Sequence, residues 1–193
     1  MGREFELKYA ATRENLEVLK GMYPHLAPIS METTYYDNHE GSFHRKYWTF
    51  RRRMENGKSV CTLKTPAGEL GRNEWEVECP DILEAVDLLC AAGAPLELAL
   101  LTARGVTESC AARFTRYAGT LEIDGAVVEL ALDRGVLLGG GKELPLTEVE
   151  VELKEGSEEA AVRFARELAE KLGLKPEKRS KVARARALAE GTL

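Results

Sequence analysis

The sequence predicts an α+β fold built on a mostly antiparallel β-sheet. Its 193 residues, 44% of them hydrophobic, are enough for one sizeable core, so we expect a single domain over residues 1–193. Segments that alternate apolar and polar residues outnumber helical segments by about two to one and follow one another directly, without βαβ alternation. The hairpin dipeptides Asn56-Gly57 and Asp124-Gly125 each join two such segments.

The first expected element is a strand at the N-terminus, where residues 3–9 read R-E-F-E-L-K-Y. Side chains alternate across a strand, so positions 4, 6 and 8 put charges on one face, and positions 5, 7 and 9 put large apolar groups on the other. A helix follows over residues 12–22, with Thr12 as its N-cap.

Three further helices are expected over residues 81–92, 157–172 and 180–189. Asp81 and Glu84 resemble a capping box, and Gly93 and Gly173 end the first two of these helices. The last helix is short and basic at its start. Residues 94–110 are expected to form a partly helical connector.

The other strands are expected over residues 31–37, 46–54, 59–65, 72–79, 113–123, 126–133 and 146–154, giving about eight in all. For any one strand, a charged face exposed to solvent is the ordinary interpretation. However, Glu is a poor strand former and like charges on neighbouring strands repel, so repeated E-x-E runs need compensating cations. If the sheet curls into a barrel with its apolar face under the helices, the charged face becomes a lumen that suits a charged guest.

The residue types indicate what this guest is. Pairs of carboxylates suit Mg²⁺, which prefers oxygen ligands and substrate phosphates, whereas converging Arg and Lys side chains bind phosphate oxygens. Gly139-Gly140-Gly141-Lys142 lacks the spacing of a Walker A motif and is expected to be a loose hairpin connection. No pattern supports covalent catalysis.

Composition excludes several classes of protein. Four scattered cysteines without a C-x-x-C pair argue against a zinc ribbon or a disulfide framework. No segment is long and apolar enough for a membrane span, and no signal peptide is evident, so a soluble, cytoplasmic protein without a membrane partner is expected. A net charge of -5 disfavours nucleic acid as a partner.

Motifs in a fixed order resemble the CYTH superfamily, also called triphosphate tunnel metalloenzymes. E-F-E-L-K at the N-terminus is similar to its E-x-E-x-K signature. Y-Y-D (35–37), R-R-R (51–53), T-L-K (62–64), E-W-E-V-E (74–78), V-E-L-A-L-D-R-G (128–135), T-E-V-E-V-E-L (147–153) and R-S-K-V-A-R (179–184) follow in family order. The resemblance implies an eight-stranded antiparallel β-barrel, or tunnel, with a charged lumen, helices packed outside and a C-terminal closing helix.

The resemblance also implies roles for individual residues. The expected ligands of Mg²⁺ or Mn²⁺ are carboxylates: Glu4, Glu6, Glu148, Glu150 and, less directly, Glu152. The expected triphosphate contacts are cations: Lys8, Arg51, Arg53, Lys64, Arg116, Lys181 and Arg184. Lys8, Arg51 and Arg53 are also expected to act in catalysis, with Glu76 and Asp133 orienting the basic residues or a second metal. Arg113 would lie on the opposite strand face from Arg116 and ranks below it.

The function implied is metal-dependent hydrolysis of a phosphoanhydride bond in a small-molecule triphosphate. Inorganic tripolyphosphate, split into pyrophosphate and phosphate, is the first expectation, because the motifs most resemble the bacterial inorganic triphosphatase-like branch. A class IV adenylate cyclase, a thiamine triphosphatase and a non-catalytic nucleotide- or polyphosphate-binding module remain alternatives. The sequence leaves a homodimer open without identifying an interface.

Overall fold

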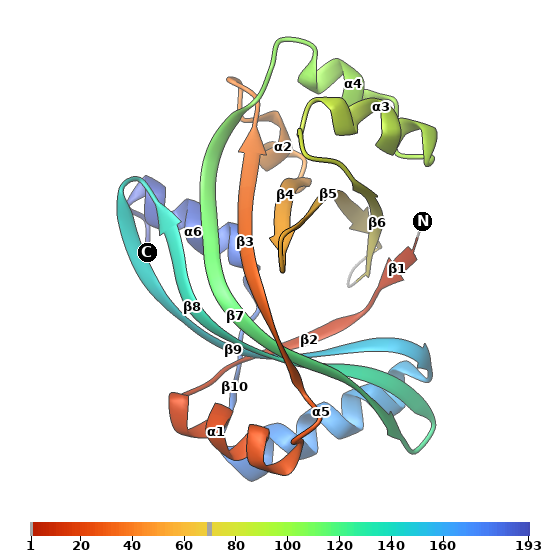
Figure 1. The fold of residues 1–193 in the computed structure, drawn as a ribbon, viewed down its shortest axis with the longest axis vertical. Helices are drawn as coiled ribbons and strands as arrows, with labels where there is room; N and C mark the ends of the chain where they lie inside the picture. Colours follow the sequence, from red (N-terminus) through yellow and green to blue (C-terminus); the bar gives the residue numbers. More distant parts are fainter. Residues whose placement is uncertain (1, 69–70) are drawn as a thin grey trace.

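A single antiparallel sheet organises the computed structural model, which describes residues 2–68 and 71–193 (Figure 1). Its strand order is β1-β6-β5-β4-β3-β7-β8-β9-β2-β10. The strands are β1 (Gly2–Glu4), β2 (Glu6–Ala10), β3 (Ala27–Asp37), β4 (Thr49–Glu55), β5 (Lys58–Ala67), β6 (Gly71–Glu78), β7 (Thr107–Ile123), β8 (Ala126–Gly139), β9 (Lys142–Gly156) and β10 (Lys175–Pro176). The helices are α1 (Arg13–Met22), α2 (Ser42–Arg45), α3 (Glu84–Ala91), α4 (Glu97–Thr102), α5 (Glu158–Leu172) and α6 (Lys181–Glu190).

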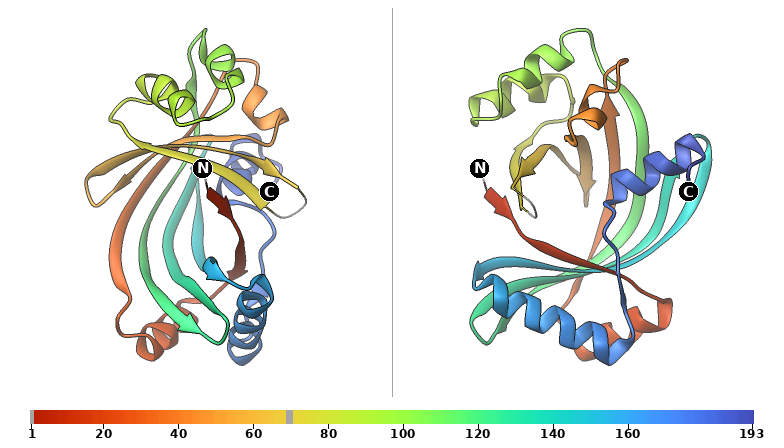
Figure 2. Two further views of the ribbon diagram at one scale, coloured as in Figure 1. Left: turned by 90° about the vertical axis from the view of Figure 1, so that its right-hand side faces the viewer. Right: turned by 180° about the vertical axis from the view of Figure 1, so that it is seen from behind.

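The α+β class and the antiparallel hairpins are confirmed, but the closed eight-stranded barrel is not. The described residues form ten strands, and hydrogen bonds do not close the sheet into a ring. The expected first strand is divided at Phe5: β1 pairs with β6, whereas β2 pairs with β9. The short strand β10 adds to β2 and ends the strand order. The continuous segment from β1 to β2 therefore connects the β6 side of the curved sheet to its β9 side (Figure 2).

Two-residue turns connect β4 to β5 and β8 to β9, and the sequence predicts the first of them. Asn56 and Gly57 have φ of 47° and 87°, the left-handed pair that a two-residue hairpin turn requires. Gly140 and Gly141, with φ of 58° and 73°, make a turn of the same kind between β8 and β9. The glycine run is thus a tight hairpin, where a loose connection was expected.

Capping side chains begin the helices near the predicted positions. Thr12 and Asn15 form a reciprocal capping box at α1, and Ser157 and Ser180 cap α5 and α6. Asp81 accepts hydrogen bonds from the backbone N–H groups of Leu83 and Glu84, as expected of a capping residue. The helix α3 itself begins at Glu84, three residues later than predicted. The connector over 94–110 contains α4 and the first residues of β7.

Two apolar cores lie on the outer face of the sheet, beneath the helices. Under α1 and α5, the side chains of Tyr9, Leu130 and Val151 are buried, with Phe5 and Leu7 packed against them. The outward orientation predicted for the apolar face of the first strand is confirmed. The second core lies between the helices α2, α3 and α4 and the strands β4, β5 and β6.

Helix α6 differs from the others because it packs against the inner side of β7 and β8 (Figure 2). Ala185 is fully buried there beside Leu137 and Phe114. A Cβ built on Gly139 would lie 2.2 Å from the carbonyl oxygen of Ala185, so only glycine allows this approach. Among the described residues, no helix has the length and hydrophobicity needed to cross a bilayer.

Candidate functional site

Strand register brings acidic residues together on the inner face. Asp133 of β8 pairs with Glu148 of β9, and Glu150 of β9 pairs with Lys8 of β2. Each of the three acidic residues offers a carboxylate oxygen within 4.8 Å of the others, and all three are buried. We call Asp133, Glu148 and Glu150 the carboxylate cluster.

The ammonium group of Lys181, at the first position of α6, lies among these carboxylates. Its Nζ is 2.8 Å from Asp133 Oδ2 and 2.6 Å from Glu150 Oε1, and it also pairs with Glu148. The surrounding carboxylates raise the pKa of Lys181 despite burial, which acts in the opposite direction. A cation therefore already occupies the centre of the carboxylate cluster.

Two arginines complete the contacts of the carboxylate cluster. The Nε and Nη2 atoms of Arg116 donate to the two oxygens of Asp133 at 2.8 and 2.7 Å, a bidentate pair, and Nη2 also donates to Glu150. Arg184 of α6 donates to Glu148. Arg116 and Arg184 thus meet the carboxylate cluster, whereas Arg113 is exposed and pairs in register with Val136.

Glu148 and Glu150 differ in their affinity for a proton. Burial raises the pKa of Glu148 to about 7, and Lys181 only partly opposes this. Burial acts on Glu150 too, but Lys181 and Arg116 outweigh it and hold the pKa of Glu150 well below its usual range. When two carboxyl groups lie this close, repulsion between their negative charges favours a state in which one keeps its proton while the other is ionised.

A second charged group lies on β4, β5 and β6. The Nη2 atom of Arg51 lies 3.6 Å from Glu74 and 3.9 Å from Glu76, and that of Arg53 lies 3.7 Å from Glu76. The hydroxyl of Thr62 donates to Glu76 at 3.0 Å. Arg51 and Arg53 of the R-R-R segment thus share one face with Glu74 and Glu76 of the E-x-E run.

The Nε groups of Arg51 and Arg53 are buried and have no hydrogen-bond acceptor among the residues that the structure describes. Glu76, Glu74 and Glu55 reach only the outer Nη2 atoms of these guanidinium groups. A buried N–H without an acceptor is costly, so both arginines have capacity left for an anionic ligand.

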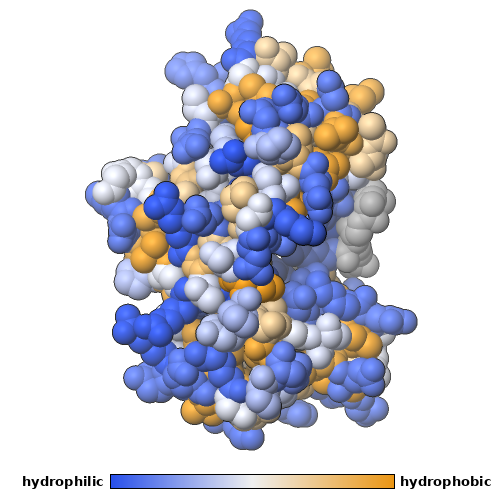
Figure 3. Space-filling model, in the orientation of Figure 1, coloured by the Kyte–Doolittle hydropathy of each residue, from blue (hydrophilic) through white to orange (hydrophobic). Residues whose placement is uncertain are grey.

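Glu4 and Lys64 link this second group to the N-terminal strand. Lys64 donates to both oxygens of Glu4, at 2.6 and 2.7 Å, and lies 3.2 Å from Glu74. Burial would raise the pKa of Glu4, but Lys64 outweighs it and the pKa is lowered. Glu4, Lys64, Arg53 and Arg116 line a cavity of about 230 Å³. Hydrophilic residues surround the hollow between the upper and lower parts of the molecule (Figure 3).

The remaining predicted metal ligands lie apart from the carboxylate cluster. Glu6 pairs with Lys8 at 2.6 Å, and Glu152 pairs with Lys154 at 2.9 Å, although Glu6 and Glu152 are cross-strand partners. Glu152 lines the 230 Å³ cavity together with Glu4. The structure thus groups Glu148 and Glu150 with Asp133, for which sequence reasoning expected an orienting role.

An ion pair that sequence reasoning missed connects α6 to the end of β3. Arg186 Nη2 lies 3.4 Å from Asp37 Oδ2, and its Nη1 lies 2.5 Å from His44 Nδ1. Asp37 also accepts backbone N–H bonds from Phe43 and His44, both at 3.0 Å. In the sequence, only the Y-Y-D segment drew attention to Asp37. Its pairing with Arg186 depends on tertiary structure and could not be predicted.

A family model described as the CYTH domain matches residues 2–185. The chain belongs to the CYTH domain family. This membership agrees with the charged inner face and with the order of the sequence motifs. The narrower resemblance to the inorganic triphosphatase-like branch is not decided by it.

Solved structures share the fold of this CYTH domain at low sequence identity. A candidate adenylate cyclase from Bacillus halodurans is 15% identical, with 95% of this chain and 98% of that chain covered and a TM-score of 0.64. The protein HpAC1 from Hippeastrum, described as an adenylyl cyclase candidate with a dominant triphosphatase activity, is 18% identical (100% and 97% covered, TM-score 0.61). PH1819 from Pyrococcus horikoshii is 23% identical (97% and 99% covered, TM-score 0.61).

Proposed function

We propose that this CYTH domain hydrolyses a terminal phosphoanhydride bond of a linear triphosphate, with Mg²⁺ or Mn²⁺ as cofactor. The observation that carries the proposal is the pairing of two charge types on one inner face. Arg51 and Arg53 each have a buried Nε donor without an acceptor, and the buried carboxylate cluster lies on the same inner face. Polyphosphate oxygens and a hard divalent cation fit these two groups.

The carboxylate cluster fits a divalent cation by its chemistry. Its donors are all carboxylate oxygens, which Mg²⁺ and Mn²⁺ prefer, and Lys181 already places a positive charge among them. When bound, the metal would neutralise charge on the phosphoryl group undergoing transfer. Asp133, Glu148 and Glu150 would hold it, with Glu4, Glu6 and Glu152 as candidates for further coordination.

The remaining inner-face residues would bind and orient the substrate. Arg51, Arg53 and Lys64 would contact phosphate oxygens from one wall. Lys8 and Arg116, with Lys181 and Arg184 once they release the carboxylates, would do so from the other. These fixed cations would stabilise the charge that develops as the leaving pyrophosphate separates.

A lumen carboxylate can also receive the proton of the attacking water. Glu76 is our candidate, because Thr62 and Arg53 hold its side chain on the inner face while it keeps contact with solvent. Water would attack the terminal phosphorus, its proton would pass to Glu76, and the bridging oxygen would leave with the bonding electrons. Inorganic phosphate and pyrophosphate would be the products from tripolyphosphate.

The neighbouring residues Arg53 and Arg52 allow a matched test. Arg53 faces the lumen, whereas Arg52 donates to the carbonyl of Pro80 on the other face. With Mg²⁺ or Mn²⁺ and tripolyphosphate, Arg53→Lys should lower turnover by about tenfold or more through loss of bidentate binding. Arg52→Lys should retain nearly full activity. Equal activity of the two variants would contradict the assignment of Arg53.

Separate incubations with tripolyphosphate, ATP and thiamine triphosphate would define the substrate. Anion-exchange separation of the products should give pyrophosphate and phosphate from tripolyphosphate, the substrate that we expect of an inorganic triphosphatase-like protein. Cyclic AMP from ATP would overturn the hydrolase assignment in favour of a cyclase. Metal-dependent binding without turnover of any of the three would favour a binding module.

A further inference from the structure

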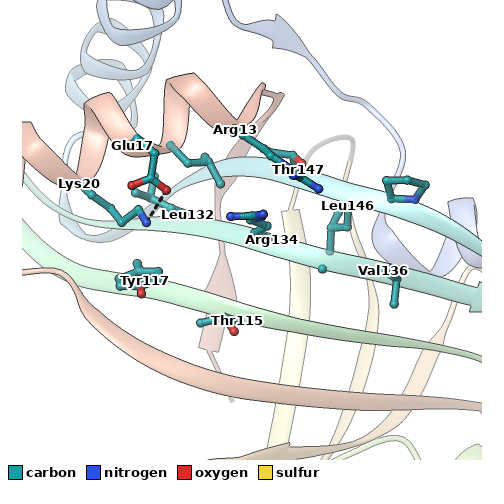
Figure 4. A pocket seen from close by; sticks show the side chains of 13 residues that line it. Arg13, Glu17, Lys20, Thr115, Tyr117, Leu132, Arg134, Val136, Leu146 and Thr147 are labelled. Carbon is teal, nitrogen blue, oxygen red and sulfur yellow. Dashed lines mark ion pairs between the residues drawn. The ribbon is translucent and has the colours of Figure 1, made fainter.

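A second cavity, of about 430 Å³, lies on the outer face of the sheet beside α1 (Figure 4). Helix α1 forms one wall, and β7, β8 and β9 form the floor. We call it the outer groove. None of the residues to which we assign a role in the triphosphate site lines the outer groove. The proposed triphosphatase activity therefore does not explain this groove.

Three cationic side chains from two elements surround the outer groove. Arg13 and Lys20 extend from α1, and Arg134 projects from β8 into the space between them (Figure 4). Lys20 is partly neutralised by Glu17, at 2.7 Å, and lies 4.6 Å from the centre of the Tyr117 ring. Arg13 and Arg134 form neither an ion pair nor a side-chain hydrogen bond with any residue that the structure describes.

These charges are unusual for their surroundings. The protein carries a net charge of -5, yet the lining of the outer groove contains two arginines and one lysine against the single acid Glu17. Two guanidinium groups without partners can each offer a bidentate fork to a phosphoryl group. Local positive charge of this kind favours an anionic ligand.

The floor of the outer groove adds an apolar surface to this charge. Val136, Pro145 and the ring of Tyr117 contribute apolar surface, and Thr115 and Thr147 contribute hydroxyl groups. A ligand that uses both parts needs an apolar body and an anionic end. Inorganic phosphate would satisfy the arginines but leave the apolar floor uncovered.

The outer groove lies directly behind the carboxylate cluster. Arg134 and Thr147 are cross-strand partners, and so are the adjacent residues Asp133 and Glu148. Because consecutive strand residues point to opposite faces, the first pair faces the outer groove and the second faces the lumen. The backbone N–H of Ala11, two residues before α1, also donates to the carbonyl of Thr147 at 3.1 Å.

We propose that the outer groove is a binding site for a small organic phosphate monoester, with the phosphoryl group at Arg13 and Arg134 and the apolar body on the strand floor. The site is separate from the proposed triphosphate site and does not depend on it. Lys20 and the threonine hydroxyls supply further donors around the phosphoryl group.

Phenyl phosphate is a suitable probe for solution NMR with ¹⁵N-labelled protein in the presence of a chelator. It should shift the backbone amide signals of Thr115, Tyr117 and Thr147 in a saturable manner. The double variant Arg13→Gln/Arg134→Gln should weaken this binding at least tenfold. Arg163→Gln, an exposed arginine of α5 outside the outer groove, should leave it unchanged. Inorganic phosphate and benzyl alcohol should each bind more weakly than phenyl phosphate.

Shifts confined to lumen residues, or unchanged affinity in the double variant, would overturn the proposal. Equal affinity for inorganic phosphate would overturn the assigned role of the apolar floor. Because the exchanged arginines are exposed and unpaired, both variants should fold, and their amide spectra check this directly. The proposed triphosphatase can fail its own test while this one succeeds, since no turnover is measured here.

Discussion

Lys181→Gln tests whether the ammonium group of Lys181 acts as the resident cation of the carboxylate cluster. Glutamine removes the charge with a side chain only one atom shorter and a similar helix propensity, and the Ser180 cap of α6 remains. The exchange leaves Asp133, Glu148 and Glu150 without the cation that contacts all three.

The expected loss of stability follows from the burial of these partners. The side chain of Lys181 is 10% exposed, and those of Asp133 and Glu148 are fully buried. Removing one partner of a buried ion pair costs about 3–5 kcal/mol, and each kcal/mol lowers Tm by about 2–4 °C in a domain of this size. In a chelator, Tm should therefore fall by about 6–20 °C.

Metal should reverse most of this loss, because a divalent cation can replace the missing ammonium. Thermal unfolding followed by circular dichroism, with EDTA and with excess Mg²⁺ or Mn²⁺, measures both effects. Lys178→Gln is the matched control, since Lys178 is an exposed lysine three residues earlier. A Tm change below about 2 °C in EDTA, or equal metal stabilisation of variant and wild type, would refute the reasoning.

Three other predictions concern single residues. Gly139→Ala should lower stability by about 1–3 kcal/mol in chemical denaturation, because its Cβ would meet α6 at 2.2 Å, whereas Gly21→Ala has open space and should be neutral or stabilising. Burial raises the pKa of Cys61 to about 12, so its thiol should stay protonated and resist iodoacetamide at pH 8, and mass spectrometry should find it modified only after unfolding. Glu76→Gln should lower triphosphate turnover at least tenfold as the lost proton acceptor, whereas exposed Glu78→Gln should leave the rate near that of wild type.

Side-chain alternation made the faces of the strands predictable from sequence. Phe5, Leu7 and Tyr9 enter the outer core, while Glu6 and Lys8 stay on the other face, because a two-residue period is fixed by strand geometry. Helix caps at Thr12, Ser157 and Ser180 are equally local. Local chemistry of this kind needs no knowledge of the tertiary fold.

The neighbours of each inner-face residue depend on strand register, which the sequence does not encode locally. Sequence reasoning grouped Glu4 with Glu148 as metal ligands. In the structure Glu148 is instead the cross-strand partner of Asp133, and Glu4 forms an ion pair with Lys64. The division of the first strand at Phe5 explains why: β1 joins β6, and β2 joins β9. The hairpin glycine Gly139 likewise gains its packing role from a helix more than forty residues away.

Under the proposed function, the ion pairs inside the lumen predict that metal and triphosphate bind cooperatively. Without ligands, Lys64 is ion-paired with Glu4, and Lys181 is ion-paired with the carboxylate cluster. A triphosphate alone must therefore compete with these carboxylates for the same lysines. If the carboxylates pair with a divalent cation, Lys181 and Arg184 become free for phosphate oxygens. Each ligand thus lowers the electrostatic cost of binding the other, and linkage requires both affinities to rise by the same factor. Calorimetric titration of a slow variant such as Glu76→Gln with tripolyphosphate and Mg²⁺, in both orders, measures that factor, and independent binding would show that the ion pairs persist in the complex.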